Sequence, residues 1–145
     1  MITAYVPGVF DMLHIGHIRI FERAREYCDE LIAGVVTDEV AEQAKGRRPI
    51  VCYEERAAIV SSLRAVDCVA KDISSDKRIM WEILKFDIIV KGNDWEGTPK
   101  GEFLERSMAE VGARVVYLPY TEHVSSSLLR SKRFGAATTA GTASS

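Results

Sequence analysis

The regular alternation of strand-like and helix-like segments is the feature that most restricts the fold of this 145-residue chain. Five short apolar runs are typical of buried strands: residues 2–6, 31–36, 67–71, 87–91 and 113–118. Segments with helical periodicity accompany them: residues 18–28, 53–64, 76–85, 102–111 and 125–133. Strands that alternate with helices pair in parallel, so the pattern predicts the α/β class, with a Rossmann-like parallel five-stranded sheet and helices on both faces.

Length and composition predict one folded domain over residues 1–134. With 47% apolar residues, the chain has enough to bury a real core. Residues 135–145 contain only Ala, Thr, Gly and Ser, which bury too little surface to offset their ordering entropy, so we expect a flexible tail. Between residues 76 and 85, Ile79, Met80, Ile83 and Leu84 are expected in the core.

Charge and cysteine content narrow the partners and the compartment. A net charge of -2 argues against a broad nucleic-acid surface. No apolar run approaches bilayer length, and the three cysteines lack C-x-x-C spacing. We therefore expect a cytoplasmic protein with reduced thiols, and neither a nucleic acid nor a membrane as a partner.

The first strand-to-helix turn carries two of the three histidines. His14 and His17 lie where unpaired backbone N–H groups and the helix macrodipole favour an anion, and phosphate is the expected one. Gly8 and Gly16 allow a ligand or packed backbone to come close. An ordinary surface pair or metal ligation are the alternatives, but zinc needs further ligands and His123 is the only other histidine.

Three later segments follow strands and would meet this turn at the carboxyl edge of a parallel sheet. Residues 45–49 predict a basic loop, in which Lys45 either contacts phosphates or is an ordinary surface residue. In residues 92–97, Asp94 and Trp95 could bind a nucleoside or merely form a turn with a packing aromatic. Within residues 121–127, the serines at 125–127 could cap a helix and bind phosphate with the same N-terminus.

The motifs together resemble a known family. Residues 8–17 resemble the signature of the small nucleotidyltransferases of the cytidylyltransferase family, which share a His-x-Gly-His element with class I aminoacyl-tRNA synthetases. The lysine- and serine-rich loop and the additional domains of synthetases are not present in this sequence. Residues 91–97 resemble the Gly-Asp-Asp-Trp-Glu-Gly stretch of glycerol-phosphate cytidylyltransferases, with Asn93 for the first aspartate, and residues 121–127 resemble Thr-Glu-Gly-Ile-Ser-Thr-Thr. The resemblance covers about residues 4–130.

This resemblance implies a nucleotidyltransferase-type fold that joins CTP to glycerol 3-phosphate or a similar polyol phosphate and releases pyrophosphate. It implies that His14 and His17 stabilise the α-phosphate, that Lys45 contacts the triphosphate, and that the protein is a homodimer. Mg²⁺ would arrive with the nucleotide, with Asp11 and Asp38 as the nearest carboxylates. The other implied nucleotide-binding residues are Gly8, Val9, Phe10, Asp11, Gly16, Gly92, Asp94, Trp95, Thr121, Ser125, Ser126 and Ser127.

A second-substrate role is implied for Arg56, Arg64 and Asp67, with ordinary ion pairs as the alternative. The sequence departs from the family pattern twice: Tyr120 stands where the family has an arginine, and His123 replaces a glycine. Two further functions stay open. One is an adenylyltransferase of the same fold that uses ATP with a sugar phosphate or flavin nucleotide. The other is a catalytically inactive nucleotide-binding regulatory domain.

Overall fold

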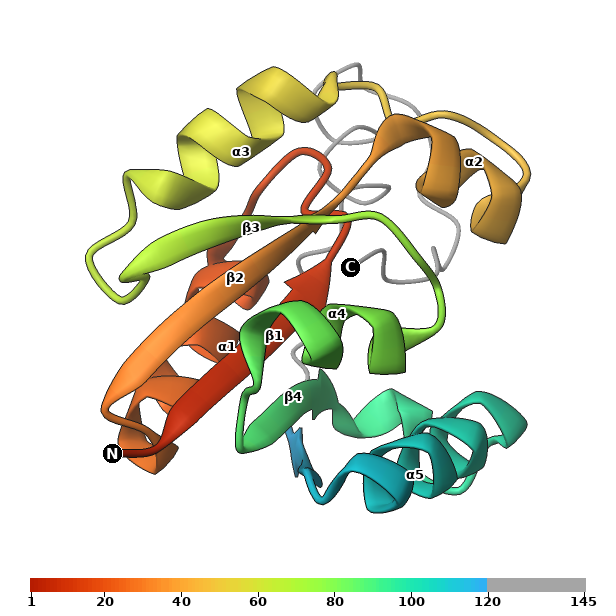
Figure 1. Ribbon diagram of the computed structural model, residues 1–145. Coiled ribbons are helices and arrows are strands. Elements are labelled where there is room, and N and C mark those ends of the chain that lie inside the picture. Colours follow the sequence, from red (N-terminus) through yellow and green to blue (C-terminus); the bar gives the residue numbers. More distant parts are fainter. Residues whose placement is uncertain (120–145) are drawn as a thin grey trace.

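A single parallel sheet forms the centre of the protein (Figure 1), whose computed structural model describes residues 1–119. The strand order is β3-β2-β1-β4-β5, and every neighbouring pair is parallel. The prediction of a parallel five-stranded sheet is confirmed. The strands are β1 (Thr3–Gly8), β2 (Glu30–Val36), β3 (Cys68–Asp72), β4 (Ile88–Gly92) and β5 (Arg114–Leu118).

Helices cover both faces of the sheet, as predicted. On one face, Val6 and Val90 of the strands share a buried cluster with Phe21 of the first helix. On the other face, Tyr5 belongs to a cluster with Met108 of the last helix described, because successive strand residues point to opposite faces. The helices are α1 (Ile15–Ala24), α2 (Asp38–Lys45), α3 (Tyr53–Ser61), α4 (Lys77–Leu84) and α5 (Pro99–Val111), with short 3-10 turns η1 (Arg25–Tyr27) and η2 (Asn93–Trp95).

Helix α2 was not predicted, because polar residues dominate its sequence. It buries only Ala41, while Thr37 caps its first turn by accepting a hydrogen bond from the N–H of Val40 at 3.2 Å. Gly46 ends it in the left-handed conformation, at φ 79°. Local capping signals and a single buried alanine therefore define this helix, and hydrophobic periodicity does not detect it.

Two other differences concern helix ends and faces. α1 begins at Ile15, three residues earlier than predicted. In α4, Met80 is 1% exposed, but Ile79 and Ile83 are 44% and 61% exposed, so the prediction that both isoleucines lie in the core is wrong. A two-turn helix presents only a narrow stripe to the sheet, and Met80 occupies it. The helix predicted over residues 125–133 and the tail lie outside the described residues.

All five strands end at the same edge of the sheet, and β1 lies between β2 and β4. From β1 the chain continues to β2 and β3 on one side of β1. It then crosses back to form β4 and β5 on the other side, so the direction in which strands are added reverses beside β1. Open α/β sheets bind ligands at the carboxyl ends of strands next to such a reversal. Within residues 1–119, no helix has the length and apolar content needed to cross a bilayer.

Candidate active site

The two histidines form the N-terminal cap of α1. The N–H of Gly16 donates to Nδ1 of His14 at 3.1 Å, and the N–H of His14 donates to Nδ1 of His17 at 3.2 Å. Each ring therefore caps the helix that carries it, in the reciprocal pattern of a capping box. Because both Nδ1 atoms accept, the neutral rings carry their proton on Nε2. The predicted place of both histidines, at the strand-to-helix turn, is confirmed.

His14 has a buried polar atom without a partner. Its side chain is 6% exposed, and Nε2 makes no hydrogen bond within the part of the chain that the structure describes. Burial lowers the pKa of His14, so the ring is neutral near pH 7 and Nε2 carries a hydrogen-bond donor. A buried donor beside a helix N-terminus suits an oxygen atom of a phosphate group.

The turn before α1 has an unusual backbone conformation. Phe10 and Met12 both have positive φ, 55° and 52°. Non-glycine residues adopt this conformation at a cost of about 1 kcal/mol or more, and such strain concentrates at functional sites. The ring of Phe10 packs edge-on against His17, with centroids 5.6 Å apart. A Cβ at Gly8 would lie 2.8 Å from that ring, so glycine is required there for this packing.

Two polar anchors hold the turn against the rest of the protein. The carboxylate of Asp11 accepts hydrogen bonds from the N–H groups of Ile50 and Val51, both at 2.9 Å. Arg56 donates to the carbonyl of Val9 at 2.6 Å and to the carbonyl of Val36 at 2.8 Å. These contacts tie the segments that follow β1 and β2 to α3.

The structure corrects the second-substrate role of Arg56. Its guanidinium is fully buried and also donates to the carboxylate of Asp38 at 2.6 Å and to the carbonyl of Val51 at 2.8 Å. A buried guanidinium with these protein partners has no face left for a substrate. Arg56 therefore positions the histidine turn.

Arg64 and Asp67 lie away from the turn. Asp67 precedes β3, where its carboxylate accepts from the N–H of Leu31 at 2.8 Å and pairs with Arg25. Both contacts are at the amino-terminal edge of the sheet, opposite the histidines, and Arg64 lies in the segment that leads to this edge. The structure therefore does not bring these two residues together with His14, and Asp67 forms an ion pair, as in the alternative reading.

The two carboxylates considered for Mg²⁺ have other partners. The oxygens of Asp11 accept the two backbone bonds given above, and those of Asp38 accept from Arg56 and from the N–H of Tyr53. Within residues 1–119, no three His, Cys, Asp or Glu side chains are grouped to hold a metal ion. The donor set thus does not fit a metal cage built by the protein.

A cleft of about 320 Å³ opens at the carboxyl edge, between α2, α4 and α5. Four lysines border it, and no aspartate or glutamate of the described chain does. Its remaining walls are mainly apolar and include Gly8 and Val9 of the turn and Trp95 of η2. The cleft therefore favours a ligand with negative charge. The four lysines are Lys45, Lys77, Lys91 and Lys100.

Lys45 does not lie in a loop as predicted. It is the last residue of α2, and it borders the cleft from that helix end. Much of its side chain is exposed, but desolvation lowers the pKa of its ammonium, and Lys100 and Arg47 lower it further. Lys45 therefore stays a candidate phosphate ligand, held by a helix.

The other three lysines of the cleft were missed in the sequence analysis. Lys77 donates to Asp72 at 2.8 Å, whereas Lys91 and Lys100 lie over the ring of Trp95, at 4.1 Å and 5.8 Å from its centroid. Lys77 and Lys100 are isolated lysines without a motif around them, whereas Lys91 opens the stretch over residues 91–97 but has no predicted role. The sequence indicates these lysines only by their position, because each lies near the end of a strand or the start of a helix at the carboxyl edge of the sheet.

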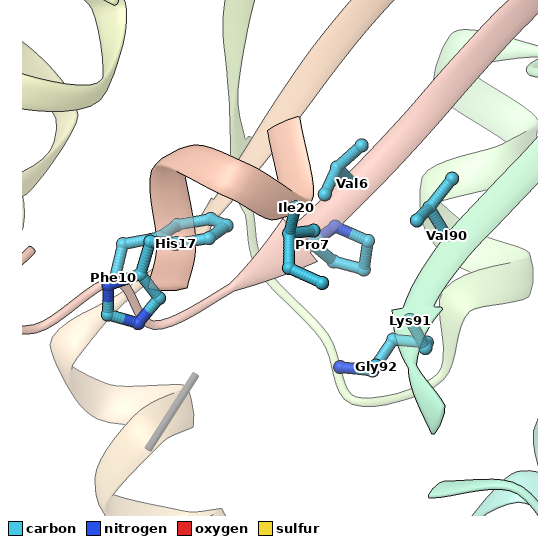
Figure 2. Close-up of a pocket in the computed structure, with 8 residues that line it drawn as sticks. All are labelled: Val6, Pro7, Phe10, His17, Ile20, Val90, Lys91 and Gly92. Atoms are coloured by element: carbon cyan, nitrogen blue, oxygen red, sulfur yellow. The ribbon is translucent and has the colours of Figure 1, made fainter. Parts of the chain in front are cut away.

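A small pocket of about 20 Å³, room for a single water, adjoins the cleft on the α1 face of the sheet. Figure 2 shows Lys91 and Gly92, at the end of β4, across this pocket from His17 and Phe10. Lys91 and Pro7 border both hollows. Lys91 therefore marks the junction between the histidine turn and the lysine cleft.

Of the predicted nucleotide-binding residues, Asp11 and Gly16 belong to the histidine turn, and most of the others lie at the two hollows. Gly8, Val9, Lys45 and Trp95 border the cleft, and Phe10 and Gly92 border the small pocket. Asp94 is exposed beside them and raises the pKa values of Lys45 and Lys91, although desolvation outweighs this effect. Thr121, Ser125, Ser126 and Ser127 lie outside the described residues. Tyr120 and His123, where the sequence departs from the family pattern, also lie there.

The sheet order, the strained turn with its helix-capping histidines and the cationic cleft define a nucleotidyltransferase. Residues 5–132 match the model of a family described as cytidylyltransferase-like. The chain belongs to this cytidylyltransferase-like family.

Individual relatives agree with this assignment. The chain is 37% identical over 135 residues to glycerol-3-phosphate cytidylyltransferase of Bacillus subtilis, covering 88% of this chain and 94% of the relative. It is 39% identical over 122 residues to FAD synthase of Thermococcus sibiricus, covering 82% and 81%. A lipopolysaccharide core biosynthesis protein of Thermoplasma volcanium has a similar structure, with a TM-score of 0.70, 29% identity and coverage of 83% and 97%.

Proposed function

We propose that this protein joins CTP to glycerol 3-phosphate, or to a similar small polyol phosphate, and releases pyrophosphate. The observation that carries the proposal is the buried Nε2 of His14 at the start of α1, which has no hydrogen-bond partner within residues 1–119 and lies close to a cleft with four lysines. The choice of CTP and of a polyol phosphate rests on the stretch over residues 91–97 and on the similarity to the Bacillus subtilis enzyme.

The chemistry requires little beyond positioning and charge stabilisation. An oxygen of the acceptor phosphate attacks the α-phosphorus of CTP, the bond from that phosphorus to the bridging oxygen breaks, and pyrophosphate leaves. The acceptor phosphate is already an anion, so no general base is needed. His14 and His17 donate from Nε2 to oxygens of the α-phosphate, and Lys45 contacts the triphosphate.

Mg²⁺ would supply charge neutralisation to the bound triphosphate. It would enter with CTP, because the nearby carboxylates hold the histidine turn and α3 in place. The homodimer and the cytoplasmic location stay predictions from the sequence.

A second candidate is an adenylyltransferase of the same fold, which the 39% identity to an FAD synthase supports. The experiment that separates the two is a pyrophosphate-release assay of the purified protein with each nucleoside triphosphate and a panel of phosphorylated alcohols, sugars and flavin mononucleotide. Turnover with CTP and glycerol 3-phosphate is the expected result. Turnover only with ATP would establish the alternative, and no turnover with any pair would favour a regulatory nucleotide-binding domain.

A further inference from the structure

Lys91 differs from the other charged residues of the protein in its surroundings. It follows Ile88, Ile89 and Val90, which are each at most 1% exposed, and Lys91 itself is partly buried, so its side chain leaves a buried strand where β4 reaches the site. Alternation along β4 directs Lys91 to the same face as Ile89, where α4 and α5 pack. The lysine therefore enters the cleft from its floor.

The ammonium of Lys91 is in no ion pair within the described part of the chain. Within residues 1–119 it makes no ion pair and no hydrogen bond, and its contact is the face of Trp95 at 4.1 Å. Lys77, on the neighbouring wall, has a different arrangement, because Asp72 neutralises it at 2.8 Å and the carbonyl of Ser74 accepts a second bond at 2.9 Å. Asp94 and Asp72 act on the Lys91 ammonium without forming an ion pair with it. A desolvated cation that no ion pair neutralises is costly in the free protein and favours an anion from outside.

The position of Lys91 indicates which anion. Lys45 ends α2, the helix that follows β2, so it lies on the β2 side of β1. On this side the triphosphate would extend from the N-terminus of α1. Lys91 lies on β4, on the opposite side of β1, and borders both the pocket of His17 and the lysine cleft. A group held by Lys91 would thus meet the α-phosphate across the end of β1.

Resting on the proposed function, we propose that Lys91 binds the phosphate of the acceptor substrate and holds it next to the α-phosphate of the nucleotide. Two anionic substrates repel each other as they approach, and an unpaired ammonium at the junction reduces that repulsion. Trp95 keeps the ammonium in place without neutralising it, because a ring face attracts a cation but carries no net charge. The acceptor class follows: a phosphate monoester whose dianionic end reaches the floor of the cleft.

The test compares Lys91→Met and Lys91→Arg with a matched control. Lys85 lies over Trp81 at 4.0 Å, the same kind of contact, but at the surface end of α4 with Glu82 as its partner, so Lys85→Met removes an equivalent lysine outside the site. Lys91→Met should raise the KM for the acceptor phosphate about tenfold to a hundredfold, as expected for one charge-assisted hydrogen bond, and change the KM for CTP less than threefold. Lys91→Arg should restore most of the affinity, and Lys85→Met should match wild type.

A second readout does not depend on turnover. In a Trp81→Phe background, inorganic phosphate should change the fluorescence of Trp95, and Lys91→Met should abolish saturable binding. Phosphate binding that survives in Lys91→Met, or a rise confined to the KM for CTP, would overturn the assignment. If wild type turns over no substrate pair but Lys91 still determines phosphate binding, the proposed function fails and the anion site stands.

Discussion

The hydroxyl of Tyr5 donates a hydrogen bond of 2.5 Å to the carboxylate of Asp72, although 67 residues separate them in the sequence. Both side chains are fully buried, and the other carboxylate oxygen accepts from Lys77 at the rim of the cleft. Burial and the neighbouring carboxylate raise the pKa of Tyr5, so its phenol keeps its proton. Tyr5 thus fixes the carboxylate of Asp72, and this carboxylate in turn fixes Lys77 at the cleft.

Tyr5→Phe should lower the free energy of unfolding by about 1–3 kcal/mol, because a buried carboxylate oxygen loses its donor. Gly34→Ala should be more damaging, since its Cβ would lie 2.1 Å from the hydroxyl oxygen of Tyr5. Urea unfolding of both single variants and the double variant measures their coupling. The double variant should be more stable than the sum of the single losses predicts; strict additivity would show that the two residues do not meet.

Variants of His14 should separate helix capping from catalysis. His14→Ala should lower kcat by on the order of a hundredfold, because it removes a donor to the reacting phosphate. It should also cost about 1 kcal/mol of stability through the lost cap. His14→Asn can still accept from the N–H of Gly16, so it should recover stability but not activity. Steady-state kinetics and urea unfolding give the two readouts, and wild-type turnover in either variant would remove His14 from the mechanism.

Arg56→Ala should lower the free energy of unfolding by about 3–5 kcal/mol, because it leaves buried carbonyl groups and the Asp38 carboxylate without a donor. Arg25→Ala is the comparison: it removes an arginine from a half-exposed pair with Asp67 and should cost about 1 kcal/mol or less. Chemical denaturation of both variants tests the difference. Equal, small losses would show that Arg56 does not hold the turn.

Residues 43–49 should become protected from hydrogen exchange when CTP binds. Lys45 ends a helix that buries only Ala41, so this segment should open easily in the free protein, and a contact between Lys45 and the triphosphate would close it. Exchange measured by mass spectrometry with and without saturating CTP tests this, with residues 62–67 at the opposite edge as the internal control. Equal exchange over residues 43–49 in both states would make Lys45 an ordinary surface residue.

Acceptor binding should weaken as the pH rises through about 8. Burial, with a smaller effect from Lys77, lowers the pKa of Lys91 to about 8; Lys45 lowers it further, and Asp94 and Asp72 oppose the shift. Lys100 is also near, over the same tryptophan. Above that pH the group is neutral and no longer attracts a phosphate. The KM for the acceptor should therefore rise up to tenfold per pH unit, and Lys91→Arg should remove the rise because arginine stays charged.

The same shift makes a prediction for stability. Between about pH 10.4 and pH 8, Lys91 is protonated in the unfolded chain but neutral in the folded protein. Protonation therefore favours the unfolded state, and the free energy of unfolding falls as the pH falls through this window. Lys91→Met should therefore be more stable than wild type at pH 7, as measured by urea unfolding. A loss of stability in Lys91→Met would contradict the burial of an uncompensated charge.

The sequence by itself determined the parallel sheet and the place of the histidine turn, because both depend on local signals. Strand-like runs of β-branched residues alternate with helical segments, and a His-x-x-His element follows the first strand. Local signals also determine α2, but these signals are the caps at Thr37 and Gly46. Because the helix has little apolar periodicity, a search for such periodicity does not detect it. The departures at Tyr120 and His123 are read from sequence and lie outside the described residues.

Only the tertiary structure decided which charged residues share the site. Arg56 and Asp67 resemble functional positions in sequence, yet one is buried under the turn and the other lies at the opposite edge of the sheet. Lys77 has no motif around it, and Lys91 opens the stretch over residues 91–97 without a predicted role. They meet because the chain places β4 next to β1 and begins α4 beside the end of β3. A charge is costly to bury unless a partner is near, and sequence spacing does not say where that partner lies, because the order of strands in the sheet determines it.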